Sequence, residues 1–252
     1  PALSVEILRT VGIGLLSLVV LALGLLDDIR GTSPREKLVV QLAAAVATWV
    51  IGVRIERLTG FSGAPLELAP WLSLLVTSAW IVGITNAVNL IDGLDGLAAG
   101  VSLIAVVTFG AFGWLDNHGL VVLVAVTLGG ALFGFLVFNW RPARITLGDS
   151  GSLFVGYVLS VVGILCTVKQ YTAFAVGVPI LALGVPIADT LFAVFRRLRD
   201  GQPVTAGDQG HVHHRLLRAG LPESHAVVWL YGTAVGLAAV ALALRAAHAP
   251  VQ

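Results

Sequence analysis

The chain has 252 residues, of which 57% are hydrophobic and 12% are charged, and its formal net charge at pH 7 is +1. Soluble globular domains carry about 25% charged residues, so this composition excludes an ordinary soluble domain and indicates a membrane protein. The small net charge also argues against nucleic acid as a partner.

Apolar runs that approach the thickness of a bilayer follow one another along the chain. These runs lack the alternation of barrel strands, and backbone in lipid must satisfy its own hydrogen bonds, so we expect helices. The predicted fold is an all-α, polytopic transmembrane helical bundle, with residues 1–252 in a single integral-membrane domain. Eight spans are expected, at residues 11–26, 38–53, 71–90, 97–115, 120–138, 152–168, 172–195 and 226–246.

Successive spans alternate in direction, so the connections after the first, third, fifth and seventh spans share one face of the membrane. These connections carry the polar motifs of the chain. They also carry ten of the fifteen Lys and Arg residues, namely Arg30, Arg35, Lys37, Arg141, Arg144, Arg196, Arg197, Arg199, Arg215 and Arg218. By the positive-inside rule this face is cytoplasmic, which places the protein in the cell membrane with its polar clusters on the inner side.

The first polar motif is the pair Asp27 and Asp28, which directly follows sixteen predominantly apolar residues (11–26). Adjacent carboxylates repel each other unless a cation lies nearby, and hard divalent cations such as Mg²⁺ prefer oxygen ligands. The pattern is equally compatible with a solvated loop that Arg30 neutralises.

The second motif is NAVNLIDGLDG, residues 86–96, at the end of the third span. Asn86, Asn89 and Asp92 are spaced by three, so on a helix they project within one arc. Gly93 and Gly96 permit close backbone approach, which suits a helix that unwinds beside a ligand. The simpler interpretation is that these residues cap and terminate a helix.

The third motif is TLGDSGS, residues 146–152, in which Asp149 lies at the entrance to the next helix. Ser150 or Ser152 is expected to cap this helix while its free backbone N–H groups attract phosphate. The preceding FNWRPAR segment supplies Asn139, together with two arginines that suit phosphate oxygens or serve as positive-inside anchors.

The fourth motif is HVHHRL, with His211, His213, His214 and Arg215 in the longest predicted cytoplasmic loop. Three imidazoles within four positions can donate to phosphate, bind a transition metal or transfer protons. Zinc is the weaker interpretation, because no cysteine is near and the carboxylates elsewhere suit a harder metal.

These four motifs, in this order and on one face, resemble the polyprenyl-phosphate N-acetylhexosamine-1-phosphate transferases, of the glycosyltransferase family 4 type. The H-x-H-H-R-L form looks like the branch that uses N-acetylglucosamine 1-phosphate and undecaprenyl or decaprenyl phosphate. The resemblance implies transfer of a sugar 1-phosphate from a UDP-sugar to a polyprenyl phosphate. UMP is then released, and the polyprenyl diphospho-sugar begins a cell-envelope glycan pathway such as that of lipopolysaccharide, teichoic acid or arabinogalactan.

The resemblance also implies roles for individual residues. It makes Asp149 the principal ligand of Mg²⁺, or of Mn²⁺ in its place, with Asp28 close to the metal and Asp27 as base or orienting group for the lipid phosphate. His211, His213 and His214 complete the expected catalytic set. The expected substrate-binding residues are Lys37, Asn86, Asn89, Asp92, Asp95, Asn139 and Arg215. Asp189, near the cytoplasmic end of its span, is either functional or paired with Arg196 or Arg197.

Three other functions remain open on the sequence. One is the related transfer of the muramoyl-pentapeptide unit in peptidoglycan synthesis, and another is an inactive scaffold. The third is a multi-span transporter, which would need polar groups through the midplane, whereas most spans are nearly pure Leu, Val, Ala, Ile and Gly. A homodimer is compatible with the sequence. Family members usually begin with two further helices and a basic loop that residues 1–10 do not resemble, so we expect a chain shortened from ten or more spans.

Overall fold

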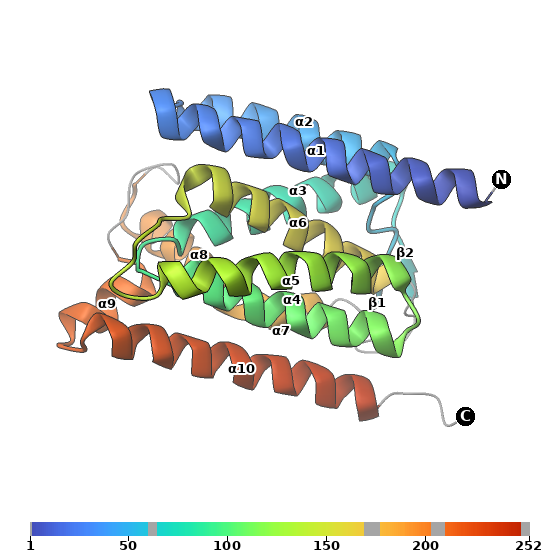
Figure 1. The fold of residues 1–252 in the computed structure, drawn as a ribbon. Coiled ribbons are helices and arrows are strands. Elements are labelled where there is room, and N and C mark those ends of the chain that lie inside the picture. Colours follow the sequence, from blue (N-terminus) through green and yellow to red (C-terminus); the bar gives the residue numbers. More distant parts are fainter. Residues whose placement is uncertain (1, 60–64, 169–176, 203–209, 248–252) are drawn as a thin grey trace.

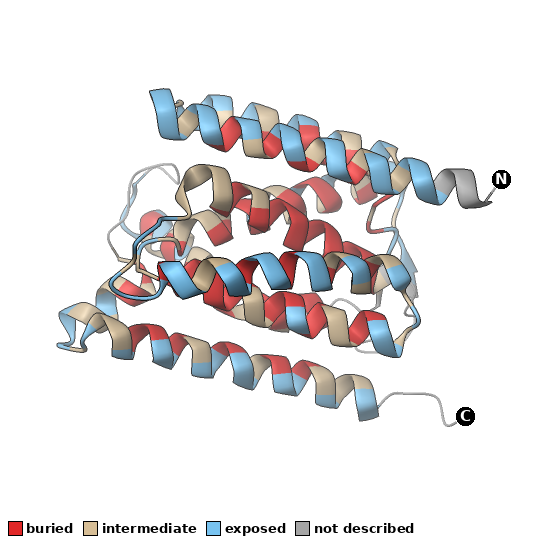
Figure 2. Ribbon diagram, in the orientation of Figure 1, coloured by how far each residue is buried: buried red, intermediate tan, exposed pale blue. Residues whose placement is uncertain are grey.

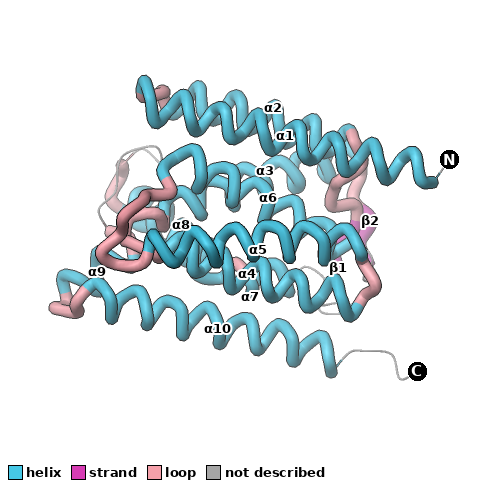
Figure 3. Tube along the Cα trace, in the orientation of Figure 1, coloured by secondary structure: helices cyan, strands magenta, loops and turns pink. Residues whose placement is uncertain are grey.

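The computed structural model of the chain describes residues 2–59, 65–168, 177–202 and 210–247 (Figure 1). The helices are α1 (Ala2–Arg30), α2 (Pro34–Val50), α3 (Pro70–Leu90), α4 (Leu97–Leu115), α5 (Gly119–Asn139), α6 (Gly148–Val168), α7 (Gly177–Ala182), α8 (Gly184–Arg199), α9 (Val212–Arg218) and α10 (Glu223–Ala247). Two short strands, β1 (Arg57–Thr59) and β2 (Pro65–Glu67), pair in antiparallel fashion between α2 and α3. The fold is therefore nearly all-helical, as predicted (Figure 3).

Six helices in the described ranges are long and apolar enough to cross a membrane: α1, α3, α4, α5, α6 and α10. The second expected span corresponds to α2, which has only 17 residues. The seventh, expected at 172–195, is interrupted at Leu183, between α7 and α8, and its first residues lie outside the described part of the chain. Pro186 lacks the N–H that a continuous helix would need, which explains the interruption. The protein is a multi-pass membrane protein.

The long helices lie side by side, and their polar connections gather at one end of the bundle (Figure 1). The α1–α2, α3–α4 and α5–α6 connections lie at this end together with α9 and the start of α10. The β1–β2 hairpin, the α4–α5 connection and both chain termini lie at the other end. Successive long helices therefore alternate in direction, as predicted, and this alternation is what places the polar motifs at one end.

Helix α6 is the centre of the bundle, and most of its residues are buried (Figure 2). Among them are Leu153, Leu159 and Val162, which are at most 1% exposed. Helices α1, α5 and α10 lie outside and carry exposed apolar side chains such as Leu15, Phe133 and Trp229. In a bilayer these apolar faces contact lipid, so the exposed hydrophobic surface is what the membrane requires.

Buried and half-buried polar side chains connect α2 with α3 and α6, and we call this set the polar seam: Gln41, Thr48, Trp49, Ser73, Asn86 and Tyr157. Asn86 Nδ2 donates to Gln41 Oε1 at 2.6 Å, Thr48 and Tyr157 share a hydrogen bond of 2.7 Å, and Trp49 Nε1 donates to Ser73 Oγ at 3.0 Å. The seam was not predicted, because the centres of most spans are almost purely apolar in the sequence. Its polar groups bond to one another, which is how polar residues hold membrane helices together.

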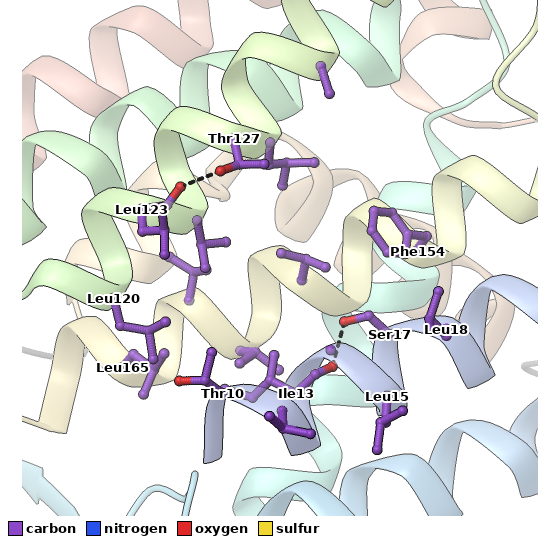
Figure 4. Close-up of a pocket in the computed structure, with 18 residues that line it drawn as sticks. Thr10, Ile13, Leu15, Ser17, Leu18, Leu120, Leu123, Thr127, Phe154 and Leu165 are labelled. Carbon is purple, nitrogen blue, oxygen red and sulfur yellow. Dashed lines mark hydrogen bonds between the residues drawn. The ribbon is translucent and has the colours of Figure 1, made fainter. Parts of the chain in front are cut away.

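An apolar cavity of about 670 Å³ lies between α1, α5 and α6 (Figure 4). The hydroxyls of Ser17 and Thr127, on its wall, donate to carbonyls of their own helices, so they offer no free donor to a polar ligand. At Gly24 the backbone of α1 touches that of α6 so closely that a Cβ atom would overlap Asp149. This contact separates the cavity from the polar end of the bundle.

Candidate active site

Lys37 joins three helices at the polar end of the bundle. Its Nζ lies 2.5 Å from Asp27 Oδ2, at the end of α1, and 2.5 Å from Asp149 Oδ2, at the start of α6. The other oxygen of Asp27 accepts hydrogen bonds from Thr32 N at 2.6 Å and from Thr32 Oγ1 at 2.5 Å. Sequence analysis placed these charged residues in one site, and the structure brings them together although Asp149 is more than one hundred residues from Lys37 along the chain.

Asp28 caps the N-terminus of α6 from a different helix. Its two carboxylate oxygens accept hydrogen bonds from Asp149 N at 2.8 Å and Ser150 N at 3.0 Å. Asp28 therefore takes the capping role expected of Ser150 or Ser152, and Ser152 Oγ donates to Gly148 O. Two of the N–H groups that were expected to face phosphate are therefore occupied by Asp28.

Two asparagines of α3 extend the site toward the bundle interior. Asn89 Nδ2 donates to Asp149 Oδ1 at 3.1 Å and to Ser152 Oγ at 2.8 Å, so it fixes the side of the carboxylate that Lys37 does not hold. One turn earlier, Asn86 forms its amide pair with Gln41 of α2. Gln41 was missed by sequence analysis, although a single amide within an apolar run was an available signal.

Asp92 lies in the loop between α3 and α4 and faces two other carboxylates. Burial raises the pKa of Asp92 to about 7, and the negative charges of Asp149 and Asp28 contribute to this rise. Within the described part of the chain its carboxylate has no hydrogen bond or ion pair, unlike Asp27, Asp28 and Asp149. Asp92 is therefore the carboxylate of this group whose charge is least compensated.

The rest of this loop is held by side chains from two other segments and by a bond from its own Asp95 to the backbone after α5. Asn139 Oδ1 accepts from Gly96 N at 3.0 Å, and Asn139 Nδ2 donates to Ile145 O at 2.8 Å. Tyr231 of α10, which was not anticipated, donates to Gly96 O at 2.5 Å. Asp95 Oδ2 accepts from Ala143 N at 3.0 Å. Asn139 and Asp95, expected to bind substrate, thus bond to backbone in this structure, and that role stays a prediction.

The histidine motif forms the start of the short helix α9 and packs against the same loop. His213 is 2% exposed, and a Cβ atom at Gly93 would lie 2.5 Å from its Nε2. Among the described residues this Nε2 has no hydrogen-bond partner. Burial, and next the neighbouring His214, lower the pKa of His213 to about 4, so its ring is neutral at pH 7.

The remaining predicted residues surround His213. The His211 and His213 rings are stacked, with centroids 5.8 Å apart, while His213 and His214 are 4.2 Å apart. Arg215 is exposed on α9. Asp189 of α8 bonds to His211 and to Val212 N, so of the two alternatives the structure does not show the pairing with Arg196 or Arg197.

Comparison with known proteins assigns the family. Residues 10–167 match the family model described as glycosyl transferase family 4. The chain belongs to glycosyl transferase family 4. This membership agrees with the resemblance drawn from the four motifs.

Curated relatives of this glycosyl transferase family 4 chain fall into two groups by name. It is 40% identical over 227 residues to a probable undecaprenyl-phosphate N-acetylglucosaminyl 1-phosphate transferase of Bacillus subtilis, covering 89% of this chain and 63% of the relative. It is 37% identical over 234 residues to a decaprenyl-phosphate N-acetylglucosaminephosphotransferase of Mycolicibacterium smegmatis, covering 84% and 57%. Against a phospho-N-acetylmuramoyl-pentapeptide-transferase of Streptococcus thermophilus the identity is 34% over 179 residues, covering 67% and 52%. The chain spans about three fifths of the length of the first two relatives.

The charge balance of the site in this family 4 protein favours a bound cation. Lys37 contacts Asp27 and Asp149, Asp28 bonds to the start of α6, and Asp92 lies near Asp28 and Asp149, so carboxyl groups outnumber the ammonium group. Within the described ranges, no three carboxylate or imidazole groups are grouped closely enough to hold a metal ion by themselves. This donor set does not fit a closed zinc site, but it fits Mg²⁺, which commonly binds one or two carboxylates together with substrate phosphates.

Proposed function

We propose that this protein transfers a sugar 1-phosphate, most simply N-acetylglucosamine 1-phosphate, from a UDP-sugar to a polyprenyl phosphate. The observation that carries the proposal is the joining of Asp27, Lys37 and Asp149 at one end of a membrane bundle, beside the uncompensated Asp92. A charged cluster at the ends of spanning helices is accessible to a soluble nucleotide and to the phosphate of a membrane lipid. The names of the relatives support this pair of substrates.

In the proposed reaction an oxygen of the lipid phosphate forms a bond to the sugar-bearing phosphorus of the UDP-sugar. The bond from that phosphorus to the bridging oxygen breaks, and UMP leaves with the electron pair. The products are UMP and the polyprenyl diphospho-sugar. Catalysis of such a transfer depends on positioning and on stabilising negative charge.

We assign the proposed Mg²⁺ to Asp149, with Asp28 close to it, and these residues would hold it with phosphate oxygens of the substrate, while the nearby charge of Asp92 adds to its attraction. When bound, the ion supplies positive charge where negative charge develops on the diphosphate. Asp27 forms an ion pair with Lys37 and is held by Thr32, so we assign it the orientation of the Lys37 ammonium toward phosphate. A phosphate is already ionised near neutral pH, so the reaction needs no base at Asp27.

The histidine motif supports contact with the nucleotide-sugar. α9 packs against the loop that carries Asp92 through the contact of His213 with Gly93, and Arg215 lies two residues after His213 on this helix. We propose that they donate to the diphosphate or the amino sugar. The H-x-H-H form of the motif, and the greater identity to the N-acetylglucosamine-named relatives, favour that sugar over the muramoyl-pentapeptide unit. The excess of Lys and Arg at this end supports a cytoplasmic site.

The test is UMP release from membranes that contain the full chain, supplied with UDP-N-acetylglucosamine, polyprenyl phosphate and Mg²⁺. We expect UMP formation that requires both the lipid and the ion, and a loss of at least about 100-fold in Asp149→Asn. Equal release from both proteins would refute the role of Asp149. Movement of a UDP-sugar into liposomes without UMP formation would instead establish transport.

A further inference from the structure

Asp189 is a buried carboxylate whose partners, among the residues that the structure describes, lie in the histidine motif. It lies on α8, and its side chain is 3% exposed. Its Oδ2 is 2.7 Å from His211 Nδ1, and its Oδ1 accepts a hydrogen bond from Val212 N at 2.6 Å. Both oxygens are therefore used to hold the residue before α9 and the first residue of that helix.

A carboxylate fixes which nitrogen of a neighbouring imidazole carries the proton. Because ionised Asp189 only accepts hydrogen bonds, His211 Nδ1 must carry a proton. His211 Nε2 is then the ring nitrogen left to accept or release a proton, or to contact a substrate. The second bond, to Val212 N, fixes the direction in which α9 starts.

The influence of Asp189 extends to the acidic loop through stacked rings. His211 stacks on His213, with an angle of 2° between the ring planes. The His213 ring in turn lies against Gly93, next to Asp92. A change at Asp189 therefore alters the imidazole that borders the candidate active site without removing any group from the acidic cluster.

We propose that Asp189 is a positioning residue, which holds His211 in the Nδ1–H form and aligns α9 against the Asp92 loop. Its link to catalysis rests on the proposed transferase function. If Asp189 served only as the ion-pair partner of an arginine, its carboxylate would contact that arginine. Its hydrogen bonds go instead to His211 and Val212.

Asp189→Asn is the informative substitution, because it keeps the size of the side chain. If the amide oxygen still accepts from Val212 N, the amide nitrogen donates toward His211 Nδ1, which forces the proton to Nε2. We expect kcat for UMP release to fall about 100- to 10,000-fold, as in enzymes whose orienting aspartate is replaced by asparagine. KM for the UDP-sugar should change by less than about threefold. Asp189→Glu, which retains the charge, should recover part of kcat.

Two measurements separate positioning from general damage. The ¹⁵N spectrum of histidine-labelled protein should show one histidine changing from the Nδ1–H to the Nε2–H form in Asp189→Asn, and this readout does not depend on activity. In a His211→Asn background, Asp189→Asn should lower kcat by no more than about twofold, because its effect acts through His211.

The outcomes are distinct. An unchanged histidine tautomer in Asp189→Asn overturns the proposal, and so does a loss of kcat that is equally large with and without His211. If the wild-type chain releases no UMP with any UDP-sugar, the proposed function fails. The tautomer measurement then decides the positioning role by itself.

Discussion

Replacing Gly93 by alanine should displace the histidine motif, because the added methyl group would occupy space that His213 fills. The Cβ atom would lie 2.5 Å from His213 Nε2 and 3.0 Å from its Cε1, whereas non-bonded atoms normally approach to about 3.5 Å or more. The ring must therefore retreat by about 1 Å. It is 2% exposed and has His211 and His214 beside it, so little room is available.

Overpacking of this kind costs about 1–3 kcal/mol. If the cost falls on the docked position of α9, the ratio of docked to undocked α9 decreases by about 5- to 150-fold. We expect kcat/KM for UMP release in membranes to fall in Gly93→Ala, by at most this factor. The backbone at Gly93 does not require a positive φ, so the predicted effect is steric.

Gly130→Ala is the matched control, because a Cβ atom at this exposed position on α5 meets nothing within 4 Å. Its activity and thermal stability should equal those of the wild type. In a His213→Ala background the clash is absent, so adding Gly93→Ala should cost less than about twofold. The reasoning is refuted if Gly93→Ala and Gly130→Ala have the same kcat/KM.

Three further predictions concern the loop and the acidic cluster. With a pKa of about 7, Asp92 holds its proton below that pH, so Mn²⁺ affinity measured by electron paramagnetic resonance should rise from pH 6 to pH 8, and Asp92→Asn should flatten this rise. Without a divalent ion, raising the pH should have the opposite effect on the folded protein and lower its stability. The folded protein retains the Asp92 proton that the unfolded chain has already lost, so the free energy of unfolding should decrease between about pH 4 and pH 7. Lys37→Met removes the ammonium group that lies between carboxylates. Without substrate, this variant should bind Mn²⁺ about 5- to 10-fold more tightly than the wild type, and it should release no UMP. Weaker Mn²⁺ binding would contradict the bridging role of Lys37. Tyr231→Phe removes the donor to Gly96 O, so thermal unfolding monitored by circular dichroism should shift down by about 2–4 °C, and an unchanged midpoint would show that the bond contributes nothing.

The sequence was sufficient to predict that the distant acidic motifs share one end of the bundle. Alternating spans place Asp28 and Asp149 at the same end, and the structure joins them through a hydrogen bond across 121 positions. The positions of charged residues and of helix ends indicate the end of the bundle to which a residue belongs, because both can be read from the sequence. The proline that interrupts the seventh span was also visible, but the apolar run around it dominated the prediction.

Other features depend on how closely helices approach, which no local pattern encodes. Asp28 can cap α6 only because Gly24 allows two backbones to touch. Tyr231 reaches the loop only because α10 packs beside α4, where a Cβ atom at Gly100 would overlap the tyrosine ring. Both contacts require tertiary geometry, so sequence periodicity did not predict them.

The polar seam has a consequence for biogenesis. α2 is short, begins with three consecutive charged residues, Arg35, Glu36 and Lys37, and carries Gln41 and Thr48, so it partitions poorly into hydrocarbon by itself. Its hydrogen-bonding partners on α3 and α6 are synthesised later, and the most distant of them, Tyr157, emerges from the ribosome about one hundred residues after α2. Stable insertion of α2 must therefore await its neighbours, which makes this helix the point where the nascent chain most needs retention by the insertion machinery.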